Sequence, residues 1–546
     1  MSKARAGFFG WHGIGWHRSW WHRSPERCAL VCPVRRSPSG RAASLAIGAH
    51  RFQPLLTLLV LCVLLAAAGR ASAQTIIYVN AAAAPGGNGQ SWGTAYQDLQ
   101  SAISEARAIP QAGRNVHIWV AQGTYYPTER YNPPDPRSVT FEAPVGVSFY
   151  GGFSGLETSI DQRNFNVFRT TLSGDVDQND GPNFTNMEEN AYFVFRILNL
   201  HGAGQCRIDG FTLTGANNVG SGGYSGAVCI AGGVVNLSNL TIWRNDLVAG
   251  ALYSSEINPT WDWNQQVTAN VDRAMIVGNR SGTGVGFYSN RGTWTVYNSA
   301  VIHNEVLGST QYTSIAVFSR GTMYLRGCTI AANVAPNTNN GVAGIFTPES
   351  AFIILNISDT VIWNNVNSSG NGPAAQASDG GLDNCRQGST SFGVDPLFVG
   401  LVGVDGVAGT LDDSVAIGAL SPLIDQGQVG NYVFAGSSPD WLLDINGLLR
   451  IVDGNGDGTA IPDIGASEYG SFPTTFAGRL YVQQGVVGGT GASWASPLGE
   501  LRHALAVSAI NNVAEIWVAA GTYTPSPPLF SGGSRTASFH LRNNLA

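Results

Sequence analysis

The phrase Asn239-Leu-Thr-Ile-Trp-Arg-Asn245 recurs with variations through the middle of the chain. Its best copies are Arg273-Ala-Met-Ile-Val-Gly-Asn279, Gly327-Cys-Thr-Ile-Ala-Ala-Asn333 and Asp359-Thr-Val-Ile-Trp-Asn-Asn365, and weaker copies are Ser299-Ala-Val-Ile-His-Asn304 and Asp209-Gly-Phe-Thr-Leu-Thr-Gly215. One apolar residue marks each copy, and successive markers lie 26 to 34 residues apart: Leu213, Ile242, Ile276, Ile302, Ile330 and Ile362. A period of about 20–50 residues indicates stacked structural repeats.

Each copy has the pattern of a short strand, because apolar and polar residues alternate and the run ends at Asn or Gly. The segments between the copies are rich in Gly, Asn and Ser, which suit tight turns, and none of them shows a long helical period. We therefore predict an all-β solenoid of stacked coils with the marker residues turned inward. A β-sandwich with irregular strands is the alternative.

The Asn that ends most copies has a physical role at a corner of such a coil. Its amide both donates and accepts, so it can bond backbone groups and the equivalent Asn above and below. These T-I-x-x-N coils resemble those of right-handed parallel β-helix repeat proteins. The resemblance implies a right-handed parallel β-helix.

Composition agrees with a turn-dense β protein, since only 12% of the residues are charged and 69 of 546 are Gly. The first 73 residues hold ten of the 30 Lys and Arg residues and one of the 36 acidic residues, Glu26. The remainder therefore carries 20 basic and 35 acidic residues, a formal charge of −15. An acidic body argues against a nucleic-acid partner and leaves room for bound cations.

Residues 1–73 read as a leader with a signal peptide. The apolar run Leu55–Ala68 has Arg51 before it and the small-x-small sequence Ala71-Ser-Ala73 after it, so we expect export and a mature start near Gln74. The run is too short to span a bilayer comfortably, and no transmembrane span is predicted in the mature chain. A buried core helix is the alternative.

Four cysteines follow the leader: Cys206, Cys229, Cys328 and Cys385. They form no C-x-x-C pair, which argues against zinc. Two disulfides are open to an exported protein. Small inward-facing apolar residues are the preferred interpretation.

Residues 74–400 are assigned to the β-helix, with an N-terminal cap. A strand at Ile77-Tyr-Val79 precedes a predicted helix from Thr94 to Ala108, in which Thr94 and Gln97 form a capping box. The apolar face of this helix is Leu99, Ala102, Ile103 and Ala106. We expect it to cover the open end of the solenoid, where unpaired edges would invite association.

Residues 401–470 form a closing segment with a different pattern. The order Asp395-Pro-Leu-Phe398, Ser421-Pro-Leu-Ile-Asp-Gln-Gly427 and Asp463-Ile-Gly-Ala-Ser-Glu-Tyr469 resembles the C-terminal part of the bacterial choice-of-anchor Q proteins. With the coils and the cap, the resemblance covers about residues 76–470. It implies an exported, surface-attached β-helix rather than a particular reaction.

Residues 480–546 repeat the start of the mature chain. The repeated pieces are Leu480-Tyr-Val482 for Ile77-Tyr-Val79, Gly488–Trp494 for Gly86–Trp92, and Glu515–Tyr523 for His117–Tyr125. We expect this segment to be the start of a second β-helix that the sequence cuts short.

The sequence gives no catalytic assignment. It has no G-x-S-x-G, H-E-x-x-H or phosphate-loop motif, and its single Lys is Lys3 in the leader. Asp272, Arg273, His303 and Arg326 lie near the coil strands, but no acidic cluster accompanies them, so solvated edge positions are preferred to lyase or hydrolase catalysis. Trp261, Asp262 and Trp263 are candidates for carbohydrate contact, since aromatic faces stack on sugar rings; packing over a coil is the alternative.

Two loops are candidates for cations. Asp453-Gly-Asn-Gly-Asp-Gly458 resembles the first half of an EF-hand calcium loop. Position twelve is Ile464 instead of Glu, so Asp463 is the proposed fourth ligand after Asp453, Asn455 and Asp457. In the other loop Asp175, Asp177 and Asp180 lie close together, and a solvated turn is preferred there to cation ligands.

Two classes of function follow. The preferred one is an exported or cell-surface scaffold that is non-catalytic and adhesive or glycan-binding, with a polysaccharide or surface glycan as partner and calcium as a candidate cofactor. The alternative is a carbohydrate-active enzyme, a polysaccharide lyase or glycoside hydrolase of the pectin-lyase-like fold.

Overall fold

The chain divides into two units, Met1–Ala71 and Ser72–Ala546, and the computed structural model describes only residues of the second. The described residues are 74–198, 205–221, 225–254, 267–290, 292–307, 317–319, 321–335, 343–346, 354–368, 386–387, 391–392, 395–433, 442–457, 460–470, 479–484, 486, 491, 493–495, 497–499, 501, 504–505 and 513–523. The predicted leader with its cleavage pattern lies outside them. Within them, no helix is long and apolar enough to cross a membrane.

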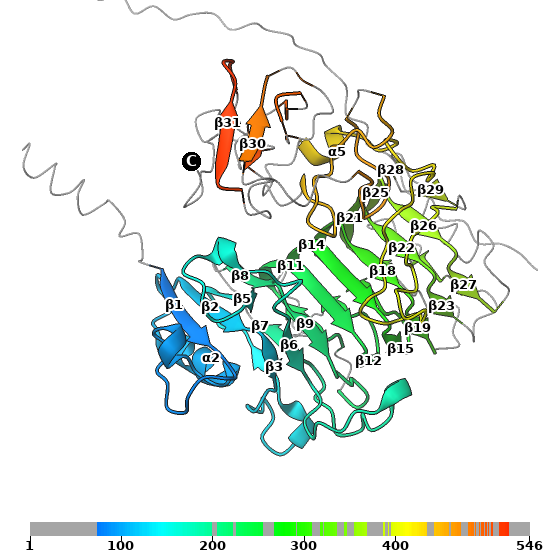
Figure 1. Ribbon diagram of the computed structural model, residues 1–546. Helices are drawn as coiled ribbons and strands as arrows, with labels where there is room; N and C mark the ends of the chain where they lie inside the picture. Colours follow the sequence, from blue (N-terminus) through cyan, green and yellow to red (C-terminus); the bar gives the residue numbers. More distant parts are fainter. Residues whose placement is uncertain are drawn as a thin grey trace, which may run out of the picture. The chain divides into compact units, whose positions relative to one another are not determined.

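Three parallel sheets run along the β-helix (Figure 1). The largest sheet contains 17 strands: β1 (Thr75–Val79), β2 (Val116–Ala121), β3 (Gly123–Tyr125), β5 (Val147–Phe153), β6 (Thr170–Ser173), β8 (Gln205–Asp209), β9 (Thr212–Thr214), β11 (Gly233–Trp243), β14 (Val267–Val277), β17 (Thr293–Tyr297), β18 (Ala300–Ile302), β21 (Thr322–Arg326), β22 (Thr329–Ala331), β25 (Ile354–Ser358), β26 (Val361–Trp363), β28 (Arg386–Gln387) and β29 (Ser391–Phe392).

The second sheet has seven strands: β4 (Phe141–Glu142), β7 (Phe195–Leu198), β10 (Val228–Ala231), β13 (Leu252–Ser254), β16 (Phe287–Ser289), β20 (Val317–Ser319) and β24 (Ile345–Phe346). The third has five: β12 (Asp246–Leu247), β15 (Arg280–Ser281), β19 (Glu305–Val306), β23 (Val334–Ala335) and β27 (Val366–Asn367). Each strand pairs with its equivalent one coil along the chain, for example β14 with β11 and β17. This pattern defines an all-β parallel β-helix, as predicted. Connections between parallel strands of one sheet are almost always right-handed, so a right-handed sense is expected for this β-helix.

The few helices are short. Among the described residues, the α-helices are α2 (Leu99–Ala108) and α5 (Gly430–Val433), and the 3-10 helices are η1 (Trp92–Thr94), η2 (Pro136–Ser138), η3 (Ile160–Gln162) and η4 (Pro182–Phe184).

A ladder of buried asparagines fixes the register of the coils. Its members are Asn245, Asn279, Asn304, Asn333 and Asn365, each at most 1% exposed. In this ladder the Nδ2 atom of Asn279 donates to Oδ1 of Asn304 at 3.0 Å and to the carbonyl of Ile242 at 2.8 Å. The backbone N–H of Asn279 also donates to that same Oδ1 at 2.9 Å. The predicted role of the corner Asn is therefore confirmed.

The apolar stack differs from the prediction at one coil. The side chains in register are Leu213, Ile242, Ile276, Val301, Ile330 and Ile362. Val301 takes the place predicted for Ile302. In every coil of the Asn ladder the stacked residue lies three positions before the Asn, and the residue three positions before Asn304 is Val301. Ile302 is still fully buried, but it packs in another cluster, with Val415 and Ala466 of the closing segment.

Helix α2 packs on the first strands of the β-helix, against β1, β2 and β4. Its apolar face of Leu99, Ala102, Ile103 and Ala106 is buried in the same core as Ile77 and Val79, as predicted. The predicted capping box is wrong, since the helix begins at Leu99 and the Oδ1 atom of Asp98 accepts the N–H of Ser101 at 2.7 Å.

The closing segment packs on the outer side of the coil strands. His303 Nδ1 lies 2.7 Å from Asp413 Oδ2, the indole of Trp243 donates to the carbonyl of Gly409 at 3.0 Å, and Thr329 Oγ1 accepts the N–H of Ala466 at 2.9 Å. These contacts cover the strands that end in the corner Asn, such as β18 and β22. They explain why Ile302 is buried although it points away from the core of the coils.

The repeated segment forms the same local structure as the start of the mature chain. Strands β30 (Arg479–Val482) and β31 (Glu515–Val518) pair in parallel, as β1 and β2 do. Tyr481 meets Trp517 edge-on at 5.7 Å, and Tyr78 meets Trp119 in the same way at 5.7 Å. Phenol hydroxyls also make equivalent backbone bonds, from Tyr125 to the carbonyl of Ala121 and from Tyr523 to that of Ala519. The domain boundaries themselves, 74–400, 401–470 and 480–546, stay predictions.

Cys206, Cys229 and Cys328 are free thiols and are buried, which favours the apolar interpretation over disulfides. Burial raises the pKa of each thiol to about 12. They are therefore small protonated core residues. Cys385 lies outside the described residues.

Candidate functional site

A polar face runs across successive coils on the outer side of the largest sheet. Side chains alternate in direction along a strand, so every second residue of β8, β11, β14, β17, β21 and β25 points away from the core. Strand pairing aligns these outward residues into two rows. The first row is Arg207, Asn236, Asn270, Thr295, Tyr324 and Asn356, and the second is Gln205, Val234, Thr268, Thr293 and Thr322. We call these two rows the polar face.

The polar face is accessible and hydrogen-bonding. Its members are exposed or half-buried, in contrast to the fully buried inward residues Val271 and Val296 on the same strands. Asn270 Nδ2 donates to Asn236 Oδ1 at 3.0 Å, so adjacent coils are linked along the row. The rows repeat at the strand spacing of about 4.8 Å. The face therefore offers amide and hydroxyl groups at regular intervals along the helix axis.

His117 extends the first row toward the N-terminal end, since it is in register with Ser148 and Ser148 with Arg207. Its pKa is lowered to about 4, mainly by burial and further by the positive charge of Arg207. The imidazole is therefore neutral at physiological pH. The charged residue at this end of the row is Arg207, and its Nη1 atom lies 3.3 Å from the buried carboxylate of Asp209.

The catalytic candidates are engaged in contacts within the protein, and the predicted solvated edge position is wrong for Asp272 and Arg273, which are 4% and 7% exposed. Arg273 Nη1 lies 2.7 Å from Asp272 Oδ2, and both side chains are buried. Arg326 Nη1 donates to the carbonyl of Asn431 at 3.3 Å, and His303 pairs with Asp413. These side chains join coils to one another or to the closing segment. Trp261, Asp262 and Trp263, the predicted carbohydrate contacts, lie outside the described residues.

The predicted calcium turn holds three of its four residues together. Asp453 Oδ1 accepts the N–H groups of Gly456 and Asp457 at 2.7 and 3.1 Å, and Asn455 Nδ2 donates to Asp457 Oδ2 at 3.2 Å. Asp463 is fully buried elsewhere, where its carboxylate accepts the N–H of Asp425 at 2.7 Å.

Asp425 is a carboxylate at this turn that the sequence did not indicate. It accepts the N–H groups of Gly454 and Asn455 at 3.1 and 2.7 Å. Burial is the main cause of its raised pKa, and Asp453 and Asp457 raise the pKa further. It lies about 30 residues from the motif, so spacing alone could not have found it. No three of the four carboxylates 425, 453, 457 and 463 have oxygen atoms within 4.8 Å of one another.

Calcium binding at this turn therefore stays a prediction, and it now requires the turn side chains to converge on the ion. Binding to the folded state alone stabilises it by roughly 2.7 kcal/mol at a hundredfold excess over Kd. We expect added calcium to raise the melting temperature and Asp457→Ala to reduce that rise. Asp395→Ala, at an exposed turn aspartate that accepts the N–H of Leu397, is the matched control. Identical melting curves of the unmutated protein in calcium and in chelator would leave the segment as a plain turn.

Among the described residues, one group of three acidic side chains is close enough to share an ion: Asp175, Asp180 and Glu189. The sequence pointed to the two aspartates but placed Asp177 with them, which is exposed and outside the group. Glu189 was missed because it lies nine residues beyond Asp180, across a loop whose closure has no sequence motif.

Comparison with solved structures gives a weak match. The crystal structure of pectate lyase Pel9A is 15% identical and aligns over 74% of this chain and 98% of that chain, with a TM-score of 0.34. No family model matches this chain, and no curated protein matches it. The strand pairing itself therefore defines the class, an all-β parallel β-helix protein.

Proposed function

We propose that this chain is an exported, surface-attached β-helix scaffold that binds an extended polysaccharide on its polar face without cleaving it. The observation that carries the proposal is the alignment of mostly amide and hydroxyl side chains in two rows, one of six residues and one of five, on successive coils. A polysaccharide presents hydroxyl groups at regular intervals and needs a matching series of donors and acceptors. Asn and Thr side chains each offer both.

Charge supports a neutral glycan as the ligand, because Arg207 is paired with Asp209. The polar face carries Arg207 at one end, and Asn236, Asn270, Thr295 and the other members between are uncharged. Tyr324 adds an aromatic side chain in the same row, and aromatic faces stack on sugar rings.

Export and attachment are supported by the sequence. The leader in residues 1–73 has the pattern of a signal peptide, and the closing segment resembles that of choice-of-anchor Q proteins. A non-catalytic role is supported by the engagement of Asp272, Arg273, His303 and Arg326 in structural contacts.

The test is a glycan array followed by titration of the best ligand with the purified mature chain. We expect the triple variant Asn236→Ala, Asn270→Ala, Asn356→Ala to bind at least tenfold more weakly, since each hydrogen bond contributes about 0.5–1.5 kcal/mol. The control variant replaces Asn88, Asn115 and Asn132, three exposed asparagines outside the polar face, with alanine.

Two outcomes would count against the proposal. If the polar-face variant and the control variant bind the glycan with equal affinity, the polar face is not the glycan-binding site. Release of oligosaccharides from pectin, alginate or another polyuronate would favour the alternative, a carbohydrate-active enzyme. Chromatography of the protein incubated with each polysaccharide detects any released oligosaccharides.

A further inference from the structure

The loop of residues 174–191, which follows β6, folds back on itself beside the coils. The N–H of Ala191 donates to the carbonyl of Gly174 at 2.8 Å, so the two ends of the loop are joined. Asn217 Nδ2, from the next coil, donates to the carbonyl of Met187 at 2.7 Å. This closure places the segment that contains Glu189 opposite the segment that begins at Asp175.

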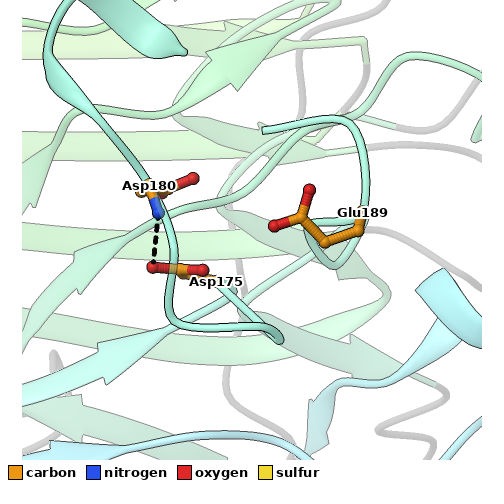
Figure 2. A group of neighbouring side chains, drawn as sticks. All are labelled: Asp175, Asp180 and Glu189. Carbon is orange, nitrogen blue, oxygen red and sulfur yellow. Dashed lines mark hydrogen bonds between the residues drawn. The ribbon is translucent and has the colours of Figure 1, made fainter. Parts of the chain in front are cut away.

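Three carboxylates converge inside this loop (Figure 2). Asp175, Asp180 and Glu189 each offer one oxygen atom, and these atoms lie within 4.8 Å of one another. Figure 2 shows the Glu189 carboxylate directed toward the two aspartates from the opposite strand of the loop. Calcium binds oxygen ligands at about 2.4 Å, so two ligands of one ion lie at most about 4.8 Å apart. The three oxygens therefore satisfy the distance condition for one calcium ion.

The loop also contains buried polar atoms that lack hydrogen-bond partners. Asn190 is 0% exposed, and its Nδ2 atom lies 3.1 Å from both carboxylate oxygens of Asp180. Its Oδ1 atom has no hydrogen-bond partner, and neither has the solvent-shielded Oε1 atom of Glu189. Buried polar groups in folded proteins are normally paired. These two oxygen atoms, which lie beside one acidic group, are therefore available to a cation.

The amide of Asn190 is suited to supply a further ligand. The oxygen and nitrogen of an Asn amide exchange places when the group turns over. In the present orientation Nδ2 donates to both oxygens of Asp180 at 3.1 Å, so the turn would exchange these two hydrogen bonds for a contact between Oδ1 and a cation beside Asp180. An ion at this position would bind the oxygen that now lacks a partner.

The charge of the group also favours a cation. Asp175 and Glu189 place negative charge beside Asp180. Arg244 supplies positive charge that acts in the opposite direction. Three carboxylates against one guanidinium leave the group with excess negative charge. A divalent ion would offset the repulsion among them.

We propose that Asp175, Asp180, Glu189 and Asn190 form a calcium site that holds the loop of residues 174–191 closed. All the ligands are hard oxygen atoms, and they come from an irregular loop. Calcium accepts six to eight such ligands in flexible geometry, whereas magnesium requires near-ideal octahedral geometry. Water completes the coordination.

The test is equilibrium dialysis of calcium against the purified full chain. All proteins carry Asp457→Ala, so that the turn of residues 453–457 does not contribute. We expect Glu189→Gln to lose one bound calcium per chain, or to bind it at least tenfold more weakly. Asp175→Asn removes a second ligand and should do the same. Asp177→Asn makes the same change of charge at an exposed residue of the same loop and should bind calcium like the parent.

Melting curves in chelator and in calcium distinguish two roles of Glu189: a calcium ligand, or a residue that stabilises the fold without calcium. Without calcium, Glu189→Gln should melt at the same temperature as the parent or higher, because the repulsion is reduced. Adding calcium should raise the melting temperature of the parent but not that of Glu189→Gln. Equal calcium binding by the parent and by Glu189→Gln would overturn the proposal. A uniform weakening by all three variants, Asp177→Asn included, would also overturn it, since that result indicates diffuse attraction to acidic surface.

Discussion

Replacing Asn304 with alanine is expected to lower the free energy of unfolding by about 3–5 kcal/mol, since each buried polar group left unpaired costs about 1–3 kcal/mol. The Nδ2 atom of Asn304 donates to the carbonyls of Ile276 and Ile302 at 2.9 and 2.8 Å and to Oδ1 of Asn333 at 3.0 Å. Its Oδ1 atom accepts the N–H of Asn279 at 2.9 Å. Alanine removes all of these bonds at the centre of the ladder.

The matched control is Asn270→Ala. Asn270 lies on the polar face, is half-buried, and bonds the equivalent Asn236 of the preceding coil. Water can replace that bond, so the expected loss is about 0.5–1 kcal/mol. Chemical denaturation followed by far-UV circular dichroism measures both variants. Losses of similar size in the two variants would show that the buried ladder contributes no more than a surface pair.

The fold was predictable because its determinants repeat along the chain. One strand, one corner Asn and one loop recur, so pattern alone indicates stacked parallel coils. Register was less accessible, since Asn298-Ser-Ala-Val-Ile-His-Asn304 has Val301 at the position where the four best copies have Ile, and Ile302 comes directly after it. Alignment on Ile302 follows side-chain identity, whereas the structure aligns Val301, because the hydrogen bonds of Asn304 cannot shift by a residue without being lost. Directional bonds thus override the small difference between two buried aliphatic side chains.

The candidate sites were less predictable, because their members meet through tertiary contacts. The turn of residues 453–457 was identified by its local motif, but Asp463 is held elsewhere by the N–H of Asp425. Glu189 reaches Asp175 only through closure of a loop, which leaves no spacing rule in the sequence. The polar face, in contrast, follows directly from strand alternation once the register of the coils is known.

Replacing Arg450 with methionine is expected to destabilise the closing segment by about 3–5 kcal/mol, the cost of removing one partner from a buried ionic group. Arg450 is 0% exposed and donates to the carbonyls of Gly465 and Asp463, both at 2.7 Å, and to the hydroxyl of Tyr432 at 2.8 Å. Its guanidinium lies 3.9 Å from the buried carboxylate of Glu468. Methionine replaces the aliphatic part of the arginine side chain but satisfies none of these groups.

The pH dependence of this loss identifies its cause. Burial raises the pKa of Asp463 from 3.8 to about 6 and that of Glu468 well above its usual value, while Arg450 acts to lower both. A carboxyl whose folded pKa is raised stabilises the protein below its unfolded pKa, and that stability is lost as pH rises through the folded pKa. Without Arg450 both pKa values rise further, so ionising these groups costs more at high pH. We therefore expect Arg450→Met to be more destabilising at pH 8 than at pH 5.

Urea denaturation at the two pH values measures this difference. The control is Arg107→Met, which removes a pair with Glu129 whose side chains are 39% and 46% exposed. Exposed pairs contribute about 0–1 kcal/mol, so this variant should lose little at either pH. Adding Glu468→Gln to Arg450→Met should restore part of the stability at pH 8, because it removes the carboxyl that the arginine no longer faces. If Arg450→Met loses the same free energy at both pH values, lost packing and hydrogen bonds rather than charge determine its effect.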